Sequence, residues 1–289
     1  MPNASPSSDS TVRPLVSGKM LLTYAILMLG SIAFVIPFYF ALNASLKTSA
    51  EVAAGDFITP VREPNFSNYP RSLAPDKMNF WPALANTTVI TTLTVIGQII
   101  SCSLVGFGFA RFSFRGKTIL FIIMISTMML PAQVTMVPVF VLFKSLGMVD
   151  TFWPLIIPAW LASPFFVFMF RQFFSQIPEE LIEAARIDGC SNWRIYWQFM
   201  LPLSGPVIAI VAIYTFLGTW NDFLGPLIYL NSPENRTIAL ALNSFRGQYG
   251  TSDAHLLMAA SVVTMLPCVI LFFAMQKYFV ESVAQSGMK

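Results

Sequence analysis

Long apolar stretches dominate the pattern of this chain, and short segments between them carry the charges. Six stretches contain no Asp, Glu, Lys or Arg: residues 20–46, 78–110, 118–143, 151–170, 195–221 and 254–276. A charge at the centre of a membrane helix costs about 2.5–3.5 kcal/mol on insertion scales, and about 20 residues cross the hydrocarbon layer. The pattern therefore predicts an all-α integral membrane protein with six transmembrane helices.

Composition supports this prediction. The chain has 289 residues, of which 55% are hydrophobic and 11% are charged, whereas soluble domains carry about 25% charged residues. The mean hydropathy is +0.66. A net charge of +3 without a basic cluster argues against a nucleic-acid partner and leaves membrane lipid as the expected surroundings.

The N-terminal region divides into two parts. Residues 1–17 are rich in Ser, Pro and Asn and are expected to form a disordered tail. The apolar core that follows runs for about 20 residues, whereas the apolar region of a signal peptide has about 7–15, so we expect an uncleaved anchor.

Positive charge in the short loops predicts the orientation. The loop Arg111–Lys117 holds three positive charges and no negative one, whereas the connection Lys144–Asp150 holds one of each. Cytoplasmic loops carry the excess of Lys and Arg. We therefore expect residues 171–202 and both termini in the cytoplasm, and residues 43–84 and 225–253 outside.

The cytoplasmic segment 171–206 has the pattern of a short helix, a turn and a second helix. Pro178 suits a first helical turn, and Glu179, Glu180 and Glu183 follow where the helix dipole favours negative charge. Leu181, Ala184 and Ala185 are expected on one face, as a narrow stripe that another surface approaches closely.

The end of this helix is also marked. Gly189 follows Asp188 and is able to adopt the positive φ of a helix C-terminus. Ser191 or Asn192 is able to cap a second helix that leads to Leu201, where the chain re-enters the membrane.

Candidate catalytic chemistry is sparse. Cys102, Cys190 and Cys268 have no disulfide or metal spacing, and His255 is the only histidine, so no catalytic residue and no metal site is predicted. The segment Gly116-Lys117-Thr118 has Arg111 where a phosphate-binding loop needs its first glycine, so no nucleotide site is predicted either.

One polar cluster contains side chains of the types that bind a sugar. Trp220, Asn221 and Asp222, at the end of the fifth stretch, offer the ring stacking and hydrogen bonds that sugars use. The same residues would equally serve as an interfacial anchor or as hydrogen bonds between helices. An ion-driven secondary carrier remains an alternative, although such carriers place ionisable residues near the midplane and these spans have almost none.

The cytoplasmic segment resembles a family motif. Glu183-Ala184-Ala185, Gly189 after three further residues, and Leu201-Pro202 resemble the EAA motif of binding-protein-dependent ABC importer permeases. Phe199 stands where that motif usually has Ile.

Further likeness points to one branch of this family. Trp220-Asn221-Asp222-Phe223 with Pro226-Leu227, Met258–Ser261 with Pro267, and Gln276–Val280 are similar to MalG-type sugar permeases. The resemblance covers most of residues 18–289 and implies a type I importer bundle, with a core transmembrane domain at about 82–277.

The resemblance implies partners and roles. A second permease subunit, ATP-binding cassette ATPase subunits and an extracytoplasmic solute-binding protein are expected, with ATP hydrolysed by the partner and no cofactor bound by this chain. The helix around Glu183, Ala184, Ala185 and Asp188 would be the coupling helix that fits the ATPase, and Gly189 would permit its turn. The implied cargo is a sugar, a polyol or a glycerol phosphate; a non-sugar solute is the alternative within the family.

Overall fold

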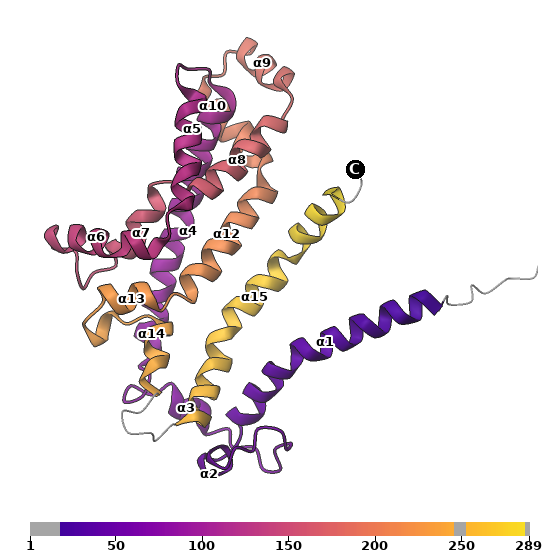
Figure 1. The fold of residues 1–289 in the computed structure, drawn as a ribbon, viewed down its shortest axis with the longest axis vertical. Helices are drawn as coiled ribbons and strands as arrows, with labels where there is room; N and C mark the ends of the chain where they lie inside the picture. Colours follow the sequence, from indigo (N-terminus) through magenta and orange to yellow (C-terminus); the bar gives the residue numbers. More distant parts are fainter. Residues whose placement is uncertain (1–17, 246–252, 287–289) are drawn as a thin grey trace, which may run out of the picture.

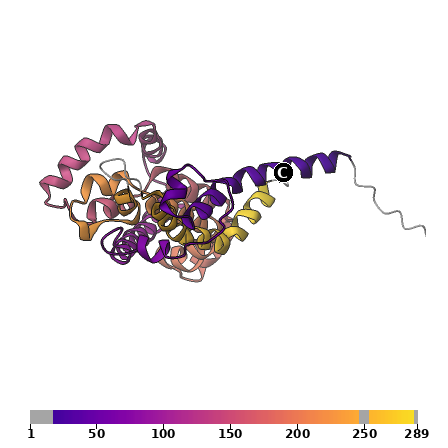
Figure 2. The same ribbon diagram turned by 90° about the horizontal axis from the view of Figure 1, so that it is seen from below.

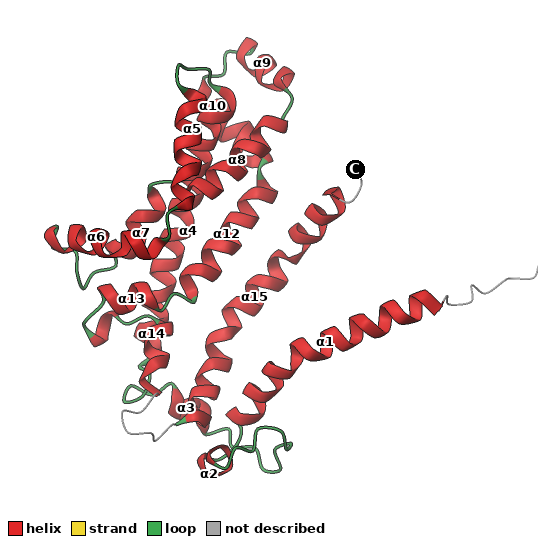
Figure 3. Ribbon diagram, viewed as in Figure 1, coloured by secondary structure: helices red, strands yellow, loops and turns green. Residues whose placement is uncertain are grey.

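The computed structural model describes residues 18–245 and 253–286, and within these ranges every regular element is helical (Figure 3). The helices that make up most of the spans are α1 (Gly18–Ser45), α4 (Phe80–Arg111), α5 (Lys117–Ser126), α6 (Ala132–Ser145), α7 (Trp153–Trp160), α8 (Pro164–Gln176), α12 (Gly205–Trp220) and α15 (Ala254–Ser286). The short α-helices are α2 (Ser49–Ala53), α3 (Asn68–Ser72), α9 (Glu179–Ile187), α10 (Asn192–Ile195), α11 (Leu201–Leu203), α13 (Leu224–Tyr229) and α14 (Ile238–Leu242). Single turns of other helix types are η1 (Thr127–Met129), η2 (Tyr196–Met200, a π-helix), η3 (Pro233–Asn235) and η4 (Asn243–Phe245).

The described helices account for the six predicted spans. Four segments are long and apolar enough to cross a membrane: Met20–Ser45, Phe80–Arg111, Trp153–Gln176 and Ala254–Gln276. Two further spans are bent pairs, Lys117–Met129 with Ala132–Ser145 at 98° and Asn192–Leu203 with Gly205–Trp220 at 75°. The expected disordered tail, residues 1–17, lies outside the described residues.

Helix α4 lies at the centre of the bundle and contacts α7, α8 and α12 (Figure 1). Two glycines of α4 allow α7 and α8 to approach it closely. A Cβ atom at Gly97 would lie 2.3 Å from the Trp160 indole nitrogen, and one at Gly106 would lie 2.7 Å from the Phe170 Cβ atom. Gly97 makes room for the Trp160 indole ring, and Gly106 allows the backbone of α8 to approach α4 closely.

At the break between α7 and α8, polar side chains of α4 form hydrogen bonds with backbone groups that have no partner within the helices. Ala162 has φ +62°, so the helix cannot continue through it. The Ser101 hydroxyl donates to the Ala159 carbonyl at 3.0 Å. In the amide orientation that satisfies both neighbours, Gln98 donates to the same carbonyl and accepts from the Ser163 N–H, each at 3.2 Å. Broken membrane helices require such internal partners, because lipid offers none.

The third predicted span is not a straight helix. Leu130 is extended at φ −82° and ψ 119°, and Pro131 follows it. Proline disfavours the helical conformation of the residue before it, so the chain turns by 98° and α6 projects from the bundle. Figures 1 and 2 show α6 extending away on one side and α1 on the other.

Helix α1 packs on α15 and, at its C-terminal end, on the loop 57–59, while most of its apolar side chains are exposed. None of its most apolar 18-residue window is buried within the chain, and the exposed residues are apolar all around the helix. This is the surface of a helix surrounded by lipid or by other membrane helices.

The two ends of the bundle are built from different segments. The helices α9 and α10 lie at one end, and α2, α3, α13 and α14 lie toward the other (Figure 1). The segments expected in the cytoplasm therefore share one end and those expected outside share the other.

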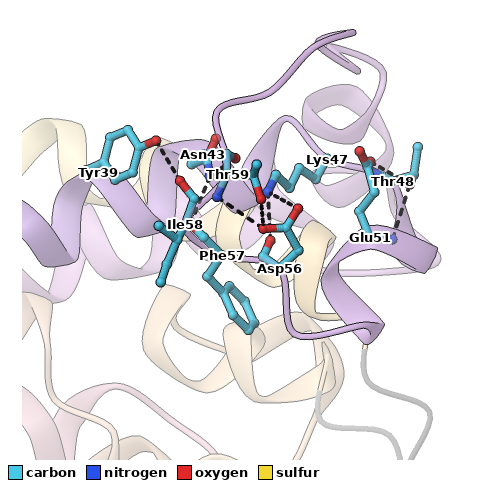
Figure 4. Close-up of polar contacts among 9 residues, drawn as sticks. All are labelled: Tyr39, Asn43, Lys47, Thr48, Glu51, Asp56, Phe57, Ile58 and Thr59. Atoms are coloured by element: carbon cyan, nitrogen blue, oxygen red, sulfur yellow. Dashed lines mark hydrogen bonds and ion pairs between the residues drawn. The ribbon is translucent and has the colours of Figure 1, made fainter.

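The end that carries α2 and α3 contains a buried ammonium group (Figure 4). Lys47 is 1% exposed; its Nζ donates to the Asp56 carbonyl at 2.7 Å and pairs with the Asp56 carboxylate at 3.0 Å. The Asn43 amide ties α1 to the same loop through the Phe57 and Thr59 carbonyls, both at 2.9 Å.

A second polar network joins the start of the fourth span to the segment that follows the fifth span. Asp150, at φ +64°, donates its N–H to the Tyr229 carbonyl at 2.7 Å. Its carboxylate accepts from the N–H groups of Asn231 and Ser232, both at 2.9 Å, and from the Ser232 hydroxyl. These bonds fix the chain reversal at 229–235 against the start of the fourth span.

Candidate functional site

Helix α9 ends in a closed glycine turn. The Gly189 N–H donates to the Arg186 carbonyl at 3.0 Å, and the Cys190 N–H donates to the Ala185 carbonyl at 2.9 Å. Gly189 has φ +79°. These are the two bonds of a Schellman motif, with Asp188 as the C-cap and glycine in the left-handed position. The positive φ predicted for Gly189 is confirmed, one position beyond the cap.

The start of α9 is tied to the end of α4 by one arginine. The Arg111 guanidinium pairs with the Glu179 carboxylate at 2.5 Å and donates to the carbonyls of Phe174 at 2.6 Å and Ile177 at 2.5 Å. The Arg111 side chain is 5% exposed. It therefore satisfies carbonyls at the end of α8 and fixes the angle at which α9 leaves the bundle. Pro178 is the N-cap of α9, one residue earlier than the first turn in which we expected it.

The two faces of α9 differ from the predicted stripe. Ile182 and Ala185, three residues apart, are buried against the bundle, with Ile182 only 1% exposed. Leu181 is 39% exposed and Ala184 is also exposed. The three predicted stripe residues are therefore divided, because Ala185 turns toward the chain's own core while Leu181 and Ala184 face outward.

The outward face is apolar with charged borders. Leu181, Ala184 and Ile187 repeat at three-residue intervals, and Ile187 is 86% exposed. Glu183 and Asp188, both predicted coupling residues, are exposed beside them. A rigid helix with a small apolar stripe and acidic neighbours offers a docking surface rather than a catalytic arrangement.

The segment after the turn is also rigid. Ser191 caps α10 by accepting the Arg194 N–H at 3.3 Å, so of the two predicted caps Ser191 is the one used. Tyr196 begins the π-helix η2 and is fully buried, with its hydroxyl 2.7 Å from the Ser103 hydroxyl of α4. Displacement of α10 would therefore be transmitted to α4.

The Trp220 cluster lies toward the opposite end of α12 and is divided. Trp220 is 5% exposed, stacks on Phe216 at 5.1 Å between ring centroids and donates its indole N–H to the Thr264 carbonyl at 3.1 Å. Asn221 is exposed and donates to the Leu217 carbonyl at 2.8 Å. The Asp222 carboxylate accepts the Gly225 N–H at 3.1 Å.

A cavity of about 340 Å³ joins two members of this cluster. It lies between α12, α14 and α15, and its lining includes Trp220, Asn221, Ser261 and Thr264 but not Asp222. The buried Trp220 ring supports helix packing, so Asn221 and Ser261 are the polar groups best able to meet a solute there. The role of the three residues in a substrate pathway stays a prediction.

Sequence reasoning missed the residues that organise the two ends. Arg111 and Asp150 entered as charges that predict orientation, Arg111 also entered as the residue that excludes a phosphate-binding loop, and the charge at position 47 entered only as the end of the uncharged stretch 20–46. Their partners are distant in sequence or depend on turn geometry, so no local pattern indicated them.

These features define a polytopic membrane bundle with a stiff helix–glycine–helix element at one end, which is the architecture of a transport subunit. Residues 102–285 match the family described as "Binding-protein-dependent transport system inner membrane component". The chain belongs to this family of transport permeases and is an integral, multi-pass membrane protein. Membership favours the ATP-driven importer over the ion-driven carrier among the predicted alternatives.

Several curated relatives are similar over nearly the whole chain. AraQ, the arabinooligosaccharides transport system permease protein of Bacillus subtilis (strain 168), is 34% identical over 275 residues, which cover 94% of this chain and 96% of AraQ. MelC, the melibiose/raffinose/stachyose import permease protein of the same organism, is 32% identical over 259 residues, which cover 89% of this chain and 92% of MelC.

The fold also has a solved counterpart. A chain in the crystal structure of a bacterial ABC transporter involved in the import of the acidic polysaccharide alginate superposes with a TM-score of 0.80. The match covers 92% of this chain and 100% of that chain at 24% sequence identity. The likeness demonstrates the shared fold.

Proposed function

We propose that this protein is one of the two permease subunits of a sugar importer, with an oligosaccharide or a related polyol as its cargo. The names of the relatives support this class, since AraQ and MelC are permeases of oligosaccharide systems. The resemblance of residues 220–227 to MalG-type permeases points to the same branch. The energy comes from ATP hydrolysed by separate ATPase subunits, and an extracytoplasmic binding protein delivers the solute.

The single observation that carries the mechanism is the construction of α9. One face is fixed to the bundle by Ile182 and Ala185, the N-terminal end is fixed by Arg111, and the opposite face is free. In this proposal Leu181, Ala184 and Ile187 enter a cleft on the ATPase, with Glu183 and Asp188 at its rim. Closure of the ATPase pair then moves α9, and the stiff attachment transmits this motion to α4 and α12.

The proposal fixes the orientation in the membrane. The end with α9 faces the cytoplasm together with both termini, and the end with α2, α3 and α14 faces outward. The three positive charges between Arg111 and Lys117 lie at the α9 end, in agreement with the positive-inside rule.

The solute would pass near the cavity that Trp220 and Asn221 line. The Asn221 amide and the Ser261 hydroxyl would exchange hydrogen bonds with sugar hydroxyls, while Trp220 holds α12 against α15 and Asp222 shapes the following turn. The second permease would supply the remaining wall of the route.

The test is the variant Gly189→Val. A β-branched residue at φ +79° costs at least about 1–2 kcal/mol and favours a different backbone path, so α9 would lose its fixed direction. No neighbouring atom lies within 4 Å of a Cβ built there, so the effect is on the backbone and not on packing. We expect normal membrane insertion and loss of ATP-dependent uptake in vesicles that contain the whole complex.

Gly147→Val is the matched control. Gly147 has φ +69° and an equally open Cβ position, but it lies in the turn between the third and fourth spans, far from α9. This variant should retain uptake. Wild-type uptake by Gly189→Val, or failure of the tagged chain to co-purify with an ATPase and a second permease, would contradict the proposal.

A further inference from the structure

A second cavity lies between the end of α4 and the start of α10. Its volume is about 270 Å³. Its lining consists of Leu104, Phe107, Phe112, Asn192, Trp193 and Tyr196. The Tyr196 hydroxyl is already paired with Ser103 at 2.7 Å, so the cavity offers hydrocarbon and ring surfaces with one free amide, that of Asn192.

The cavity lies beside the last two turns of α4, at the end of the uncharged stretch 78–110. Leu104 precedes the last residue of α4 by seven positions, which corresponds to about 10 Å along the helix. Phe112 is the first residue beyond α4, and Trp193 beside it is 62% exposed. Tryptophan is enriched at membrane–water interfaces. A water-soluble partner would therefore reach only the rim, whereas an acyl chain is able to fill the interior.

Three basic residues lie near the lining of this cavity, Lys117 by a direct contact and Arg115 and Arg194 by their positions in the sequence. The Lys117 ammonium lies 2.9 Å from the carbonyl of the lining residue Phe112. Arg115 lies in the same short connection, and Arg194 follows the lining residue Trp193. Among residues 20–245 and 253–276 the ion pairs involve Lys47, Lys77 and Arg111, so Lys117, Arg115 and Arg194 have no carboxylate partner there.

We infer that this cavity binds an anionic phospholipid, with one acyl chain against Leu104, Phe107 and Trp193 and the headgroup phosphate at Lys117. Basic groups at the cytoplasmic membrane surface each contribute substantially to binding of anionic lipid. The occupied cavity joins α4 to α10, three residues beyond Gly189, and so stiffens the attachment of α9. This last consequence rests on the proposed function of α9, whereas lipid binding does not.

The test of binding uses the purified full-length chain reconstituted in phosphatidylcholine vesicles. Phosphatidylglycerol with brominated acyl chains is added, and quenching of tryptophan fluorescence is compared between wild type and Trp193→Phe. The difference isolates the signal of Trp193. We expect this signal to be quenched at a several-fold lower mole fraction of brominated phosphatidylglycerol than of brominated phosphatidylcholine.

Variants that remove one positive charge test whether the preference for the anionic lipid depends on Lys117. Lys117→Gln should reduce the preference for the anionic lipid about fivefold, as expected for the loss of one cation near the surface. Lys144→Gln removes an exposed lysine at the end of α6 and should leave the preference unchanged. Leu104→Phe should narrow the cavity and weaken quenching of Trp193 by both lipids without lowering the yield of folded protein.

Equal quenching by the two lipids would overturn the inference, and so would quenching that Lys117→Gln leaves unaltered. The same measurement is repeated on the assembled complex, and protection of Trp193 there with no effect of lipid charge would assign the cavity to a protein partner and also overturn the inference. Because no ATP enters this measurement, its outcome is independent of the Gly189→Val uptake assay.

Discussion

The two ends of this molecule are held together in contrasting ways. At the end with α2 and α3, polar side chains and backbone groups are linked in a dense local network around Lys47 (Figure 4), and a second network surrounds Asp150. At the end with α9, one arginine and two buried apolar side chains make the attachment, and most of the helix surface is free. The first end is fixed on many sides, and the second is fixed on one side only.

This difference indicates that the two ends respond differently when one of their elements moves. A loop with several independent bonds keeps its shape when any one element moves, because the remaining bonds resist the change. An element fixed on one side moves as a unit with the helix that holds it, and its free side remains available to a partner. The first construction resists deformation, and the second would transmit force if α9 docks on an ATPase as proposed.

The largest effect on this contrast is expected from Arg111→Gln. The substitution removes the ion pair with Glu179 and leaves the carbonyls of Phe174 and Ile177 without their donor at a nearly buried position. Unsatisfied groups of this kind cost about 1–3 kcal/mol each. We expect a lower thermal midpoint and ATP hydrolysis by the assembled complex that no longer drives uptake.

Glu179→Gln is the matched variant on the other side of the pair. The Glu179 side chain is 54% exposed, so the pair itself contributes at most about 1 kcal/mol, while Arg111 keeps both carbonyl contacts. This variant should retain most of the uptake. If both variants behaved alike, the ion pair and not the carbonyl contacts would hold α9.

A smaller effect is expected from Asp150→Ala at the opposite end. Alanine supplies no acceptor for the N–H groups of Asn231 and Ser232, and it disfavours φ +64°. Asp150→Asn keeps an acceptor oxygen and tolerates this φ, so it should be close to wild type. Hydrogen exchange of residues 229–238 should accelerate in the first variant only, whereas equal exchange in both would remove Asp150 from its organising role.

The local sequence pattern was sufficient to predict much of the fold and the turn at Gly189. Uncharged length predicted the six spans, and the acidic first turn followed by Asp188-Gly189 predicted the helix and its end, because these signals lie within a few adjacent residues. The 98° bend at Pro131 was not predicted. Pro37 and Pro138 lie within continuous helices, so proline alone does not reveal where a span breaks.

Contacts between distant segments were beyond the sequence. Ile182 and not Leu181 faces the core, because the direction of α9 is set by Arg111 in another helix. Trp220 suits sugar stacking by its type, yet its N–H is bonded to Thr264 and its ring is stacked on Phe216. Residue type indicates what a side chain is able to do, and packing decides which of these possibilities is realised.

The smallest effect concerns pH at the fixed end. The hydrogen bond from the Thr59 hydroxyl, followed by the one from Lys47, lowers the pKa of Asp56 from its ordinary 3.8 to about 2. Because the folded pKa is the lower one, the folded state binds fewer protons, and the stabilisation is complete above about pH 4 and is lost as the pH falls toward about 2. Hydrogen exchange of residues 43–59 should therefore be faster in Asp56→Asn than in wild type by a ratio that stays constant from about pH 8 to about pH 5 and declines only below about pH 4. A ratio that changed near neutral pH would mean that the Lys47–Asp56 contact is not what holds this loop on α1.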